Sequence, residues 1–231
     1  MPVTERYFRI LAHLEADGDG LSASVLCRTA ADIVGIRGAG VMLMSDDVPR
    51  GSACSSNALS RHLEDVQYKL GEGPCIDAFH LGNPVLESDL MGSGSGRWVA
   101  FSPPALAAGA RAVFGFPLQL GAVRLGLLIF CCERPGALTD DQYADALAMA
   151  DVVVRSVLAM QARSSPGIVP ADLLDGSDFH FAVHQASGMV SVQLGVSVAE
   201  ALIRLRAQAF AENRLVSEIG DDIVSRRFRF T

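Results

Sequence analysis

The sequence predicts an α+β protein in which short strands and their flanking helices precede one long helix and a small three-helix bundle. Three observations support this prediction. Short apolar runs bounded by turn residues recur as far as residue 132, which is typical of strands. An apolar period of 3.6 residues takes over after Thr139 and again after residue 178. A segment rich in proline, glycine and serine, residues 164–177, separates these two helical regions.

The composition is that of a protein that forms a core. Half of the 231 residues are apolar and only 6% are aromatic. The first residues contain Glu5 and two arginines and lack the apolar segment of a secretion signal. The apolar run at residues 123–132 is interrupted by Arg124 and is shorter than the roughly 18 residues of a membrane span. We therefore expect a soluble, cytoplasmic protein.

The cysteines favour free thiols, because their number is odd and the chain has no export signal. They are Cys27, Cys54, Cys75, Cys131 and Cys132. No Cys-x-x-Cys pair and no Cys/His cluster has zinc spacing. Cys131 and Cys132 are adjacent on a predicted strand, so their side chains should point to opposite faces. We expect buried structural thiols, with redox sensing as the alternative.

The elements before the long helix are predicted from periodicity, capping residues and turns. A helix is expected over residues 4–16, and a second begins after the capping residue Ser22. Strands are expected at residues 41–44, 51–56, 84–87, 112–120 and 123–132. Gly121-Ala122 separates the last two strands and indicates a hairpin.

The long helix is expected to begin at Asp140, because Thr139 and Gln142 have the spacing of a capping box. Its apolar stripe extends from Tyr143 to Leu158, and the helix ends near residue 163. Such a helix either covers the sheet or pairs with its copy in a dimer, and both alternatives stay open. We assign residues 1–163 to a first domain and residues 164–177 to a linker.

Residues 178–231 are expected to form the bundle. Its first helix ends at Gly195, a typical C-terminal glycine. The second opens with the capping box of Ser197 and Glu200 and turns inward Leu202, Leu205, Ala209 and Phe210. The third is spaced by Leu215, Ile219 and Ile223.

Charge is unevenly distributed along the chain. Six arginines balance six acidic residues in 178–231, so the net charge of −7 arises entirely upstream. A neutral segment whose cations are all arginine is compatible with nucleic-acid binding but is no basic patch. Charge alone does not decide between nucleic-acid and protein partners.

No signature of an enzyme, a metal site or a cofactor site is complete. The glycine–serine run at residues 92–96 lacks the Gly-x-Ser-x-Gly pattern, and Gly71-Glu72-Gly73 lacks the remaining residues of a nucleotide-binding loop. His180 and His184 share a helical face without a third ligand, and His80 is an isolated haem candidate. We therefore predict no enzymatic activity, no metal and no cofactor.

Two parts of the sequence resemble known families. The ANTAR domain of actinobacterial regulators is similar to this chain at His184–Val190, Gln193–Ser197, Glu200–Phe210 and Asp222–Arg227. A GAF domain is similar to it at Leu70–Ala78, Pro84–Leu86, Arg97-Trp98 and the predicted hairpin of residues 112–116 and 123–130. Together the two resemblances cover nearly the whole chain, in a familiar order.

The ANTAR resemblance implies an RNA-binding transcription antiterminator, which binds paired stem-loops in a nascent transcript and prevents a terminator hairpin from forming. The GAF resemblance implies a mainly antiparallel sheet with a small-molecule pocket, or a dimerisation platform without a ligand. We therefore expect a signal-responsive antitermination regulator that acts as a homodimer on stem-loop RNA.

Two alternatives belong to other classes. The first is a small-molecule or redox sensor whose C-terminal helices bind a protein, which the neutral charge of residues 178–231 favours. The second is a GAF-fold enzyme that reduces methionine sulfoxide through Cys75 or Cys131, which the missing paired cysteines oppose.

The RNA contacts implied by the ANTAR resemblance lie in the bundle. They are Gln185, Ala186, Gly188, Met189, Ser197, Glu200, Ala201, Arg204, Arg206 and Arg214. Small residues let RNA approach the backbone, a helix N-terminus attracts phosphate, and arginines bind it. Many members of the family carry a basic residue where this chain has Ser187, which places more weight on the three arginines.

Each of these residues also has a purely structural interpretation. The two alanines and Met189 can fill the core of the bundle, and Gly188 can permit close helix crossing. Ser197 and Glu200 can cap each other, and Arg204 can pair with Glu200 on a solvated face.

Overall fold

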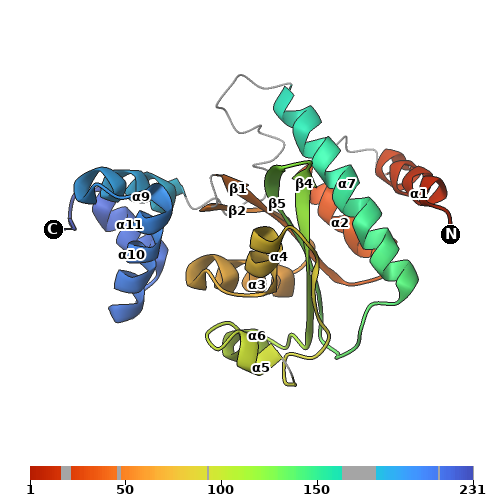
Figure 1. The fold of residues 1–231 in the computed structure, drawn as a ribbon, viewed down its shortest axis with the longest axis horizontal. Coiled ribbons are helices and arrows are strands. Elements are labelled where there is room, and N and C mark those ends of the chain that lie inside the picture. Colours follow the sequence, from red (N-terminus) through yellow and green to blue (C-terminus); the bar gives the residue numbers. More distant parts are fainter. Residues whose placement is uncertain (17–21, 46–47, 93, 163–180, 213, 231) are drawn as a thin grey trace.

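The computed structural model describes residues 1–16, 22–45, 48–92, 94–162, 181–212 and 214–230. A five-stranded antiparallel sheet has helices on both faces, and three C-terminal helices pack on one another beside it (Figure 1). This α+β architecture is the one that the sequence predicts. The linker predicted at residues 164–177 lies outside the described residues, so the domain boundaries stay a prediction.

The sheet has the strand order β2-β1-β5-β4-β3. The strands are β1 (Gly38–Ser45), β2 (Val48–Ser55), β3 (Val85–Glu87), β4 (Ala112–Leu120) and β5 (Val123–Cys132). All five coincide with predicted strands, and Gly121 turns the β4–β5 hairpin with a φ of 60°. Strand β1 begins at Gly38, three residues before the predicted start at residue 41. Its first residues include Gly38 and Gly40, where a Cβ would overlap the side chains of Cys131 and Glu64.

One face of the sheet is covered by two helices in direct contact with it. They are α2 (Ala23–Val34) and α7 (Asp140–Ala162), and α1 (Val3–Ala16) packs against both. Phe114, Phe116 and Phe130 extend from the strands into this core. Helix α7 opens with the expected capping box, in which Gln142 N donates to Thr139 Oγ1 at 3.2 Å. The helix therefore covers the sheet of its own chain, and pairing with a second copy stays a prediction.

The opposite face is covered by α3 (Ala58–Leu70) and α4 (Pro74–Leu81). Two short helices lie near them on the same side of the sheet, α5 (Gly94–Arg97) and α6 (Ser102–Ala107) (Figure 1). Val113, Leu127 and Ile129 belong to this second core, because alternate residues of a strand point to opposite faces. Cys131 belongs to this core and Cys132 packs against the first, as the sequence predicts.

Helices α3 and α4 are elements that the sequence analysis does not predict. Asn57 caps α3, since Ser60 N donates to Asn57 Oδ1 at 2.8 Å. Glu64 and Gln67 occupy buried positions of this helix, so polar residues interrupt the apolar period that would have revealed it.

The C-terminal bundle consists of α9 (Phe181–Leu194), α10 (Val198–Ala211) and α11 (Val216–Val224). Gly195 ends α9 with a φ of 65°, and Ser197 Oγ accepts from Glu200 N at 3.1 Å, as expected. The inward position predicted for Phe210 is wrong, because its side chain is 84% exposed. The buried stripe of α10 includes Ala209, and Phe210 lies about 100° further round the helix.

No single helix among the described residues is long and apolar enough to cross a membrane. Helices α9 and α10 reach the necessary length and apolar composition only when taken together, and the angle between them is 105°.

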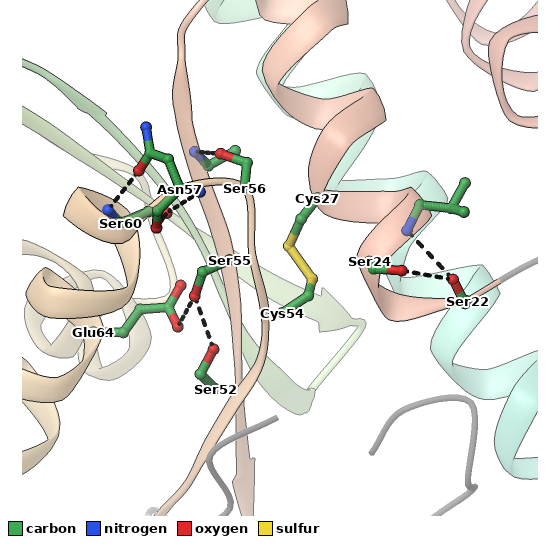
Figure 2. Close-up of a disulfide and its surroundings, with 12 residues drawn as sticks. Ser22, Ser24, Cys27, Ser52, Cys54, Ser55, Ser56, Asn57, Ser60 and Glu64 are labelled. Carbon is green, nitrogen blue, oxygen red and sulfur yellow. Dashed lines mark hydrogen bonds between the residues drawn. A yellow bond between two sulfur atoms is a disulfide. The ribbon is translucent and has the colours of Figure 1, made fainter. Parts of the chain in front are cut away.

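A disulfide corrects the expectation that all five thiols are free. Cys27 of α2 and Cys54 of β2 are joined by a disulfide with a Cα–Cα distance of 6.1 Å (Figure 2). Both residues are buried, whereas Cys75, Cys131 and Cys132 are free. The odd count of cysteines could not reveal this pair, because the fold alone brings α2 against the edge strand β2.

Replacing both bridged cysteines, Cys27→Ser with Cys54→Ser, is expected to lower the free energy of unfolding by about 3–4 kcal/mol. The bridge closes a loop of 27 residues and restricts the unfolded chain accordingly. Urea denaturation of the wild type and the double variant measures the difference, with Cys132→Ser as the control for losing a thiol. Titration of thiols in denaturant should give three, and a count of five would contradict the assignment.

Candidate functional site

A groove of about 710 Å³ lies on the C-terminal bundle. Helix α9, the end of α11 and the segment after α11 form its walls. The lining residues are Gln185, Gly188, Met189, Val192, Gln193, Ile223, Arg226, Phe228 and Arg229. The surface is therefore a mixture of apolar side chains, side-chain amides and guanidinium groups.

The segment after α11 folds back to form one wall. Its turn is held by Asp222 O, which accepts from Arg227 N at 2.7 Å and from Phe228 N at 3.1 Å. Phe230 N donates to Gln193 Oε1 of α9 at 3.3 Å. The rings of Phe228 and Phe230 meet edge to face with centroids 5.2 Å apart. These contacts give the groove a defined shape.

The groove carries positive charge although the bundle as a whole is neutral. Arg226 and Arg229 are both exposed at its rim. Among the residues that the structure describes, neither has a carboxylate within ion-pair distance. Two guanidinium groups are therefore available to an anionic ligand.

Gly188 lies in the middle of α9 on the surface of the groove. A Cβ built there would meet no atom within 4 Å, so packing within the chain does not require glycine. Gly220 of α11 differs, because its Cβ would lie 3.1 Å from Val183 N where α9 and α11 cross. The helix-crossing interpretation thus fits Gly220 and not Gly188. Glycine inside a helix costs about 0.5–1 kcal/mol relative to alanine, and at Gly188 no close contact from the described residues offsets this cost.

The structure places the expected contacts of α9 in two environments. Gln185, Gly188 and Met189 line the groove together. Ala186 is fully buried in the bundle. Ser187 is also fully buried, and its Oγ donates to Val183 O at 2.8 Å. This position therefore faces the interior here, where a charged side chain would have no access to phosphate.

The expected contacts of α10 lie away from the groove lining. Ala201 is buried, and Ser197 caps the helix by accepting from Glu200 N, the one half of the predicted capping box that is found among the described hydrogen bonds. Arg204 donates to Glu200 Oε1 at 2.7 Å on an exposed face. An exposed pair of this kind contributes little to stability and leaves the guanidinium only partly compensated.

The arginine at the start of the third helix is surrounded by acidic residues. Arg214 lies 3.1 Å from a Glu212 oxygen, 3.7 Å from a Glu218 oxygen and 2.7 Å from an Asp222 oxygen. Hydrogen bonds from Arg214 and then from Arg227 lower the pKa of Asp222. This cluster is close to neutral or negative in sum, unlike the groove.

Arg206 points to the sheet-containing part of the chain. Its Nη2 donates to Tyr68 O, and its guanidinium lies 5.6 Å from the centre of the Tyr68 ring. Burial lowers the pKa of Arg206 to about 10. The three arginines predicted as RNA contacts thus have three different environments.

Three groove residues, Arg226, Phe228 and Arg229, are absent from the contacts that the sequence analysis predicts. The alternation Arg-Arg-Phe-Arg-Phe at 226–230 is the signal for them, since basic and aromatic side chains together are typical of single-stranded nucleic-acid sites. His180, half of the weak metal-binding pair, lies outside the described residues.

The second core contains a buried carboxyl group. Glu64 accepts from Ser55 Oγ at 3.1 Å through Oε2, and Ser52 lies 3.2 Å from Ser55 (Figure 2). Its Oε1 packs against Gly40 and has no hydrogen-bond partner among the described residues. Burial raises the pKa of Glu64 to about 8. The group is therefore mostly protonated at neutral pH.

This chain is similar to known proteins in its three-dimensional structure. No protein-family model matches the chain, and no curated protein matches it. The GAF domain of the Acinetobacter phosphoenolpyruvate-protein phosphotransferase superposes with a TM-score of 0.51 at 13% identity, covering 70% of this chain and 96% of that one. The sheet-containing part of this chain has the GAF fold.

A second structure agrees. The GAF domain of a phosphoenolpyruvate-protein phosphotransferase from Coxiella burnetii gives a TM-score of 0.50 at 11% identity, covering 69% of this chain and 96% of that one. At such identities the likeness extends to the fold alone. It confirms the GAF-like fold, and the ANTAR resemblance stays a prediction.

Glu64→Gln is expected to remove a pH dependence of stability from the GAF-fold part. Because the pKa of Glu64 rises from 4.5 to about 8 on folding, the folded chain keeps a proton that the unfolded chain loses. Between these pH values the free energy of unfolding falls as pH rises, by at most about 1.4 kcal/mol per pH unit. The variant should match the wild type near pH 4.5 and exceed it increasingly toward pH 8.

Denaturation at several pH values measures this difference. Glu5→Gln, which neutralises an exposed carboxylate on α1, is the control and should follow the wild type. A Glu64→Gln variant with an unchanged pH profile would refute the buried, protonated state.

Proposed function

We propose that this chain is a signal-responsive, RNA-binding regulator of transcription antitermination. Its C-terminal bundle binds stem-loop RNA in the groove, and its GAF-fold part receives the signal. The observation that carries the proposal is Gly188, a mid-helix glycine that opens onto a groove flanked by two arginines without ion-pair partners in the described part of the chain. The resemblance of residues 184–230 to ANTAR domains supplies the connection to antitermination.

The chemistry of the groove suits an unpaired RNA loop. Sequence-specific proteins bind loop bases that are splayed out of the stack, and they place them on apolar or aromatic side chains. Met189 and Phe228 offer such surfaces, and both are half-buried. The side-chain amides of Gln185 and Gln193 can bond base edges, while Arg226 and Arg229 bind the flanking phosphates.

The GAF-fold part is assigned a regulatory role. GAF domains typically sense small molecules, and here we propose a sensor or dimerisation unit without catalytic activity. The free thiols support this, because burial raises the pKa of Cys75 and Cys131 well above the ordinary value and disfavours the reactive thiolate. As a homodimer, the protein would present two grooves to two adjacent stem-loops, and linkage would raise the effective concentration at the second.

A protein partner is the second candidate for the bundle. The side chains of Ile203 and Phe210 on α10 are 62% and 84% exposed, with exposed Ala207 between them. Contiguous exposed apolar residues often mark protein interfaces. This candidate replaces the first if the wild type does not bind RNA and Phe210→Ser abolishes its control of transcription.

Arg229→Ala is expected to weaken binding to a two-stem-loop RNA by about ten-fold or more, because a charge-assisted hydrogen bond contributes roughly 1.5–3 kcal/mol. Losing one phosphate contact should also reduce the slope of log K against log salt by about 0.7–0.9. Titrations at several salt concentrations measure both quantities. Arg155→Ala on α7 changes the net charge equally, and equal losses in the two variants would contradict a specific contact in the groove.

Gly188→Ala is expected to separate stability from binding. The added methyl group meets open space, so the helix should gain about 0.5–1 kcal/mol. The same methyl group protrudes into the groove and should lower RNA affinity. Gly220→Ala is the matched control, since it crowds α9 and should destabilise the bundle. Wild-type RNA affinity in a stabilised Gly188→Ala variant would exclude close approach of RNA at this position.

A further inference from the structure

The C-terminal bundle contacts the GAF-fold part partly through the half-buried guanidinium of Arg206. Arg206 of α10 donates to Tyr68 O, one of the last four carbonyls of α3. The last carbonyls of a helix form the negative end of its dipole. Arg206 therefore satisfies an acceptor of α3 and places a cation where the helix dipole favours it.

Gly71 brings the arginine close to the backbone. This residue ends α3 with a φ of +64°, and a Cβ there would lie 2.7 Å from Arg206 Nη1. Two independent constraints thus favour glycine at this position, the left-handed backbone and the guanidinium stacked over it. The atom in the way is the end of a flexible side chain, so a methyl group at this position would displace Arg206.

The contact is half-buried and only partly compensated. Arg206 Nε is inaccessible to water and has no hydrogen-bond partner among the described residues. The apolar residues of α9, α10 and α11 form one continuous cluster with the core beneath α3, and α10 also lies against β2. Burying a charge with a polar atom left unpaired costs free energy, and this cost opposes the apolar contacts that favour docking.

We propose that Arg206 is a latch that docks the RNA-binding bundle on the end of α3 and that the signal received by the GAF-fold part releases it. In the docked state Arg206 is withheld from RNA, while Arg204 on the neighbouring face of α10 stays exposed. The effect on RNA binding rests on the proposed function. The docking rests on the contact between Arg206 and Tyr68.

Helix α3 connects the latch to the interior of the GAF-fold part. One turn before Tyr68 it carries Glu64 in the second core, and Gln67 Oε1 accepts from Cys75 N of α4 at 2.8 Å. A ligand that enters this core and shifts α3 moves the Tyr68 carbonyl with it. A signal that shifts this carbonyl weakens the hydrogen bond from Arg206 and favours the undocked state.

Gly71→Ala tests the latch, with Gly35→Ala as its matched control. Both glycines end a helix in the left-handed conformation, with φ of 64° and 70°, but a Cβ at Gly35 meets no atom within 4 Å. Both variants therefore carry the same backbone strain, and only Gly71→Ala displaces Arg206. Small-angle X-ray scattering of the full chain without RNA should show a larger radius of gyration for Gly71→Ala alone. Equal radii for the two variants would overturn the latch.

RNA binding measures the regulatory part separately. Gly71→Ala keeps Arg206 and frees it, so its affinity for a two-stem-loop RNA should rise by at least about five-fold over Gly35→Ala, the low end of usual coupling between sites. Expansion without a gain in affinity would refute control of RNA binding by the latch. If the wild type and every variant fail to bind RNA, the proposed function fails, while the scattering result still judges the docking.

A second pair of variants guards against misfolding at Gly71. Arg206→Ala removes the latch, and Arg204→Ala removes an exposed arginine two residues earlier on the same helix. The first should expand the chain in scattering and the second should not. If Arg206→Ala stays as compact as Arg204→Ala, α10 is docked by other contacts and the inference is wrong.

Discussion

Helix α3 buries polar groups where water cannot reach them, and the arrangement around it follows from the need to satisfy them. Glu64 takes a hydrogen bond from Ser55 of β2, and Gln67 accepts one from the backbone of α4. The carbonyl of Tyr68 receives a guanidinium from α10. An unpaired buried polar group costs about 1–3 kcal/mol, so each bond fixes a neighbouring element relative to α3. The helix thereby joins the sheet, the second core and the C-terminal bundle.

The edge strand β2 is held from both of its faces. Successive residues of a strand point to opposite sides, so Cys54 reaches α2 through the disulfide while Ser55 reaches Glu64 of α3 (Figure 2). An edge strand is otherwise prone to fraying or to pairing with other chains. Helix α10 also lies against β2. The disulfide and the hydrogen bond to Glu64 therefore stabilise the surface on which the bundle docks.

Much of the fold could be predicted from local chemistry. Capping at Thr139 and Ser197, the strand runs and the Gly121 turn are signals within a few residues, and they located α7, α10 and the β4–β5 hairpin. Helix α3 escaped prediction because Glu64 and Gln67 stand where the period expects apolar residues. The disulfide of Cys27 and Cys54 escaped it because 27 residues separate partners that only the folded sheet brings together.

The candidate site was predictable in part for the same reason. Gln185, Gly188 and Met189 lie on one helix, and helical spacing brings them together whatever the rest of the chain does. Arg226 and Arg229 reach the groove only because the chain reverses after α11, with Arg226 at a φ of 59° that sequence patterns do not encode. The environment of Arg206 depends on a contact with Tyr68, 138 residues away.

The neutral charge of the bundle conceals a separation of its arginines by environment. Arg214 is surrounded by three carboxylates, and Arg206 is half-buried against a helix end. Arg226 and Arg229 lie at the groove, and neither has an acidic partner among the residues that the structure describes. A bundle with a net charge of zero can thus contain a positively charged site. The two charges of an ion pair within about 4 Å largely cancel each other's field, whereas the charge of an arginine without such a partner is not cancelled. The binding surface of such a module therefore depends on which of its arginines are paired with a carboxylate. The net charge of the sequence does not reveal this pairing.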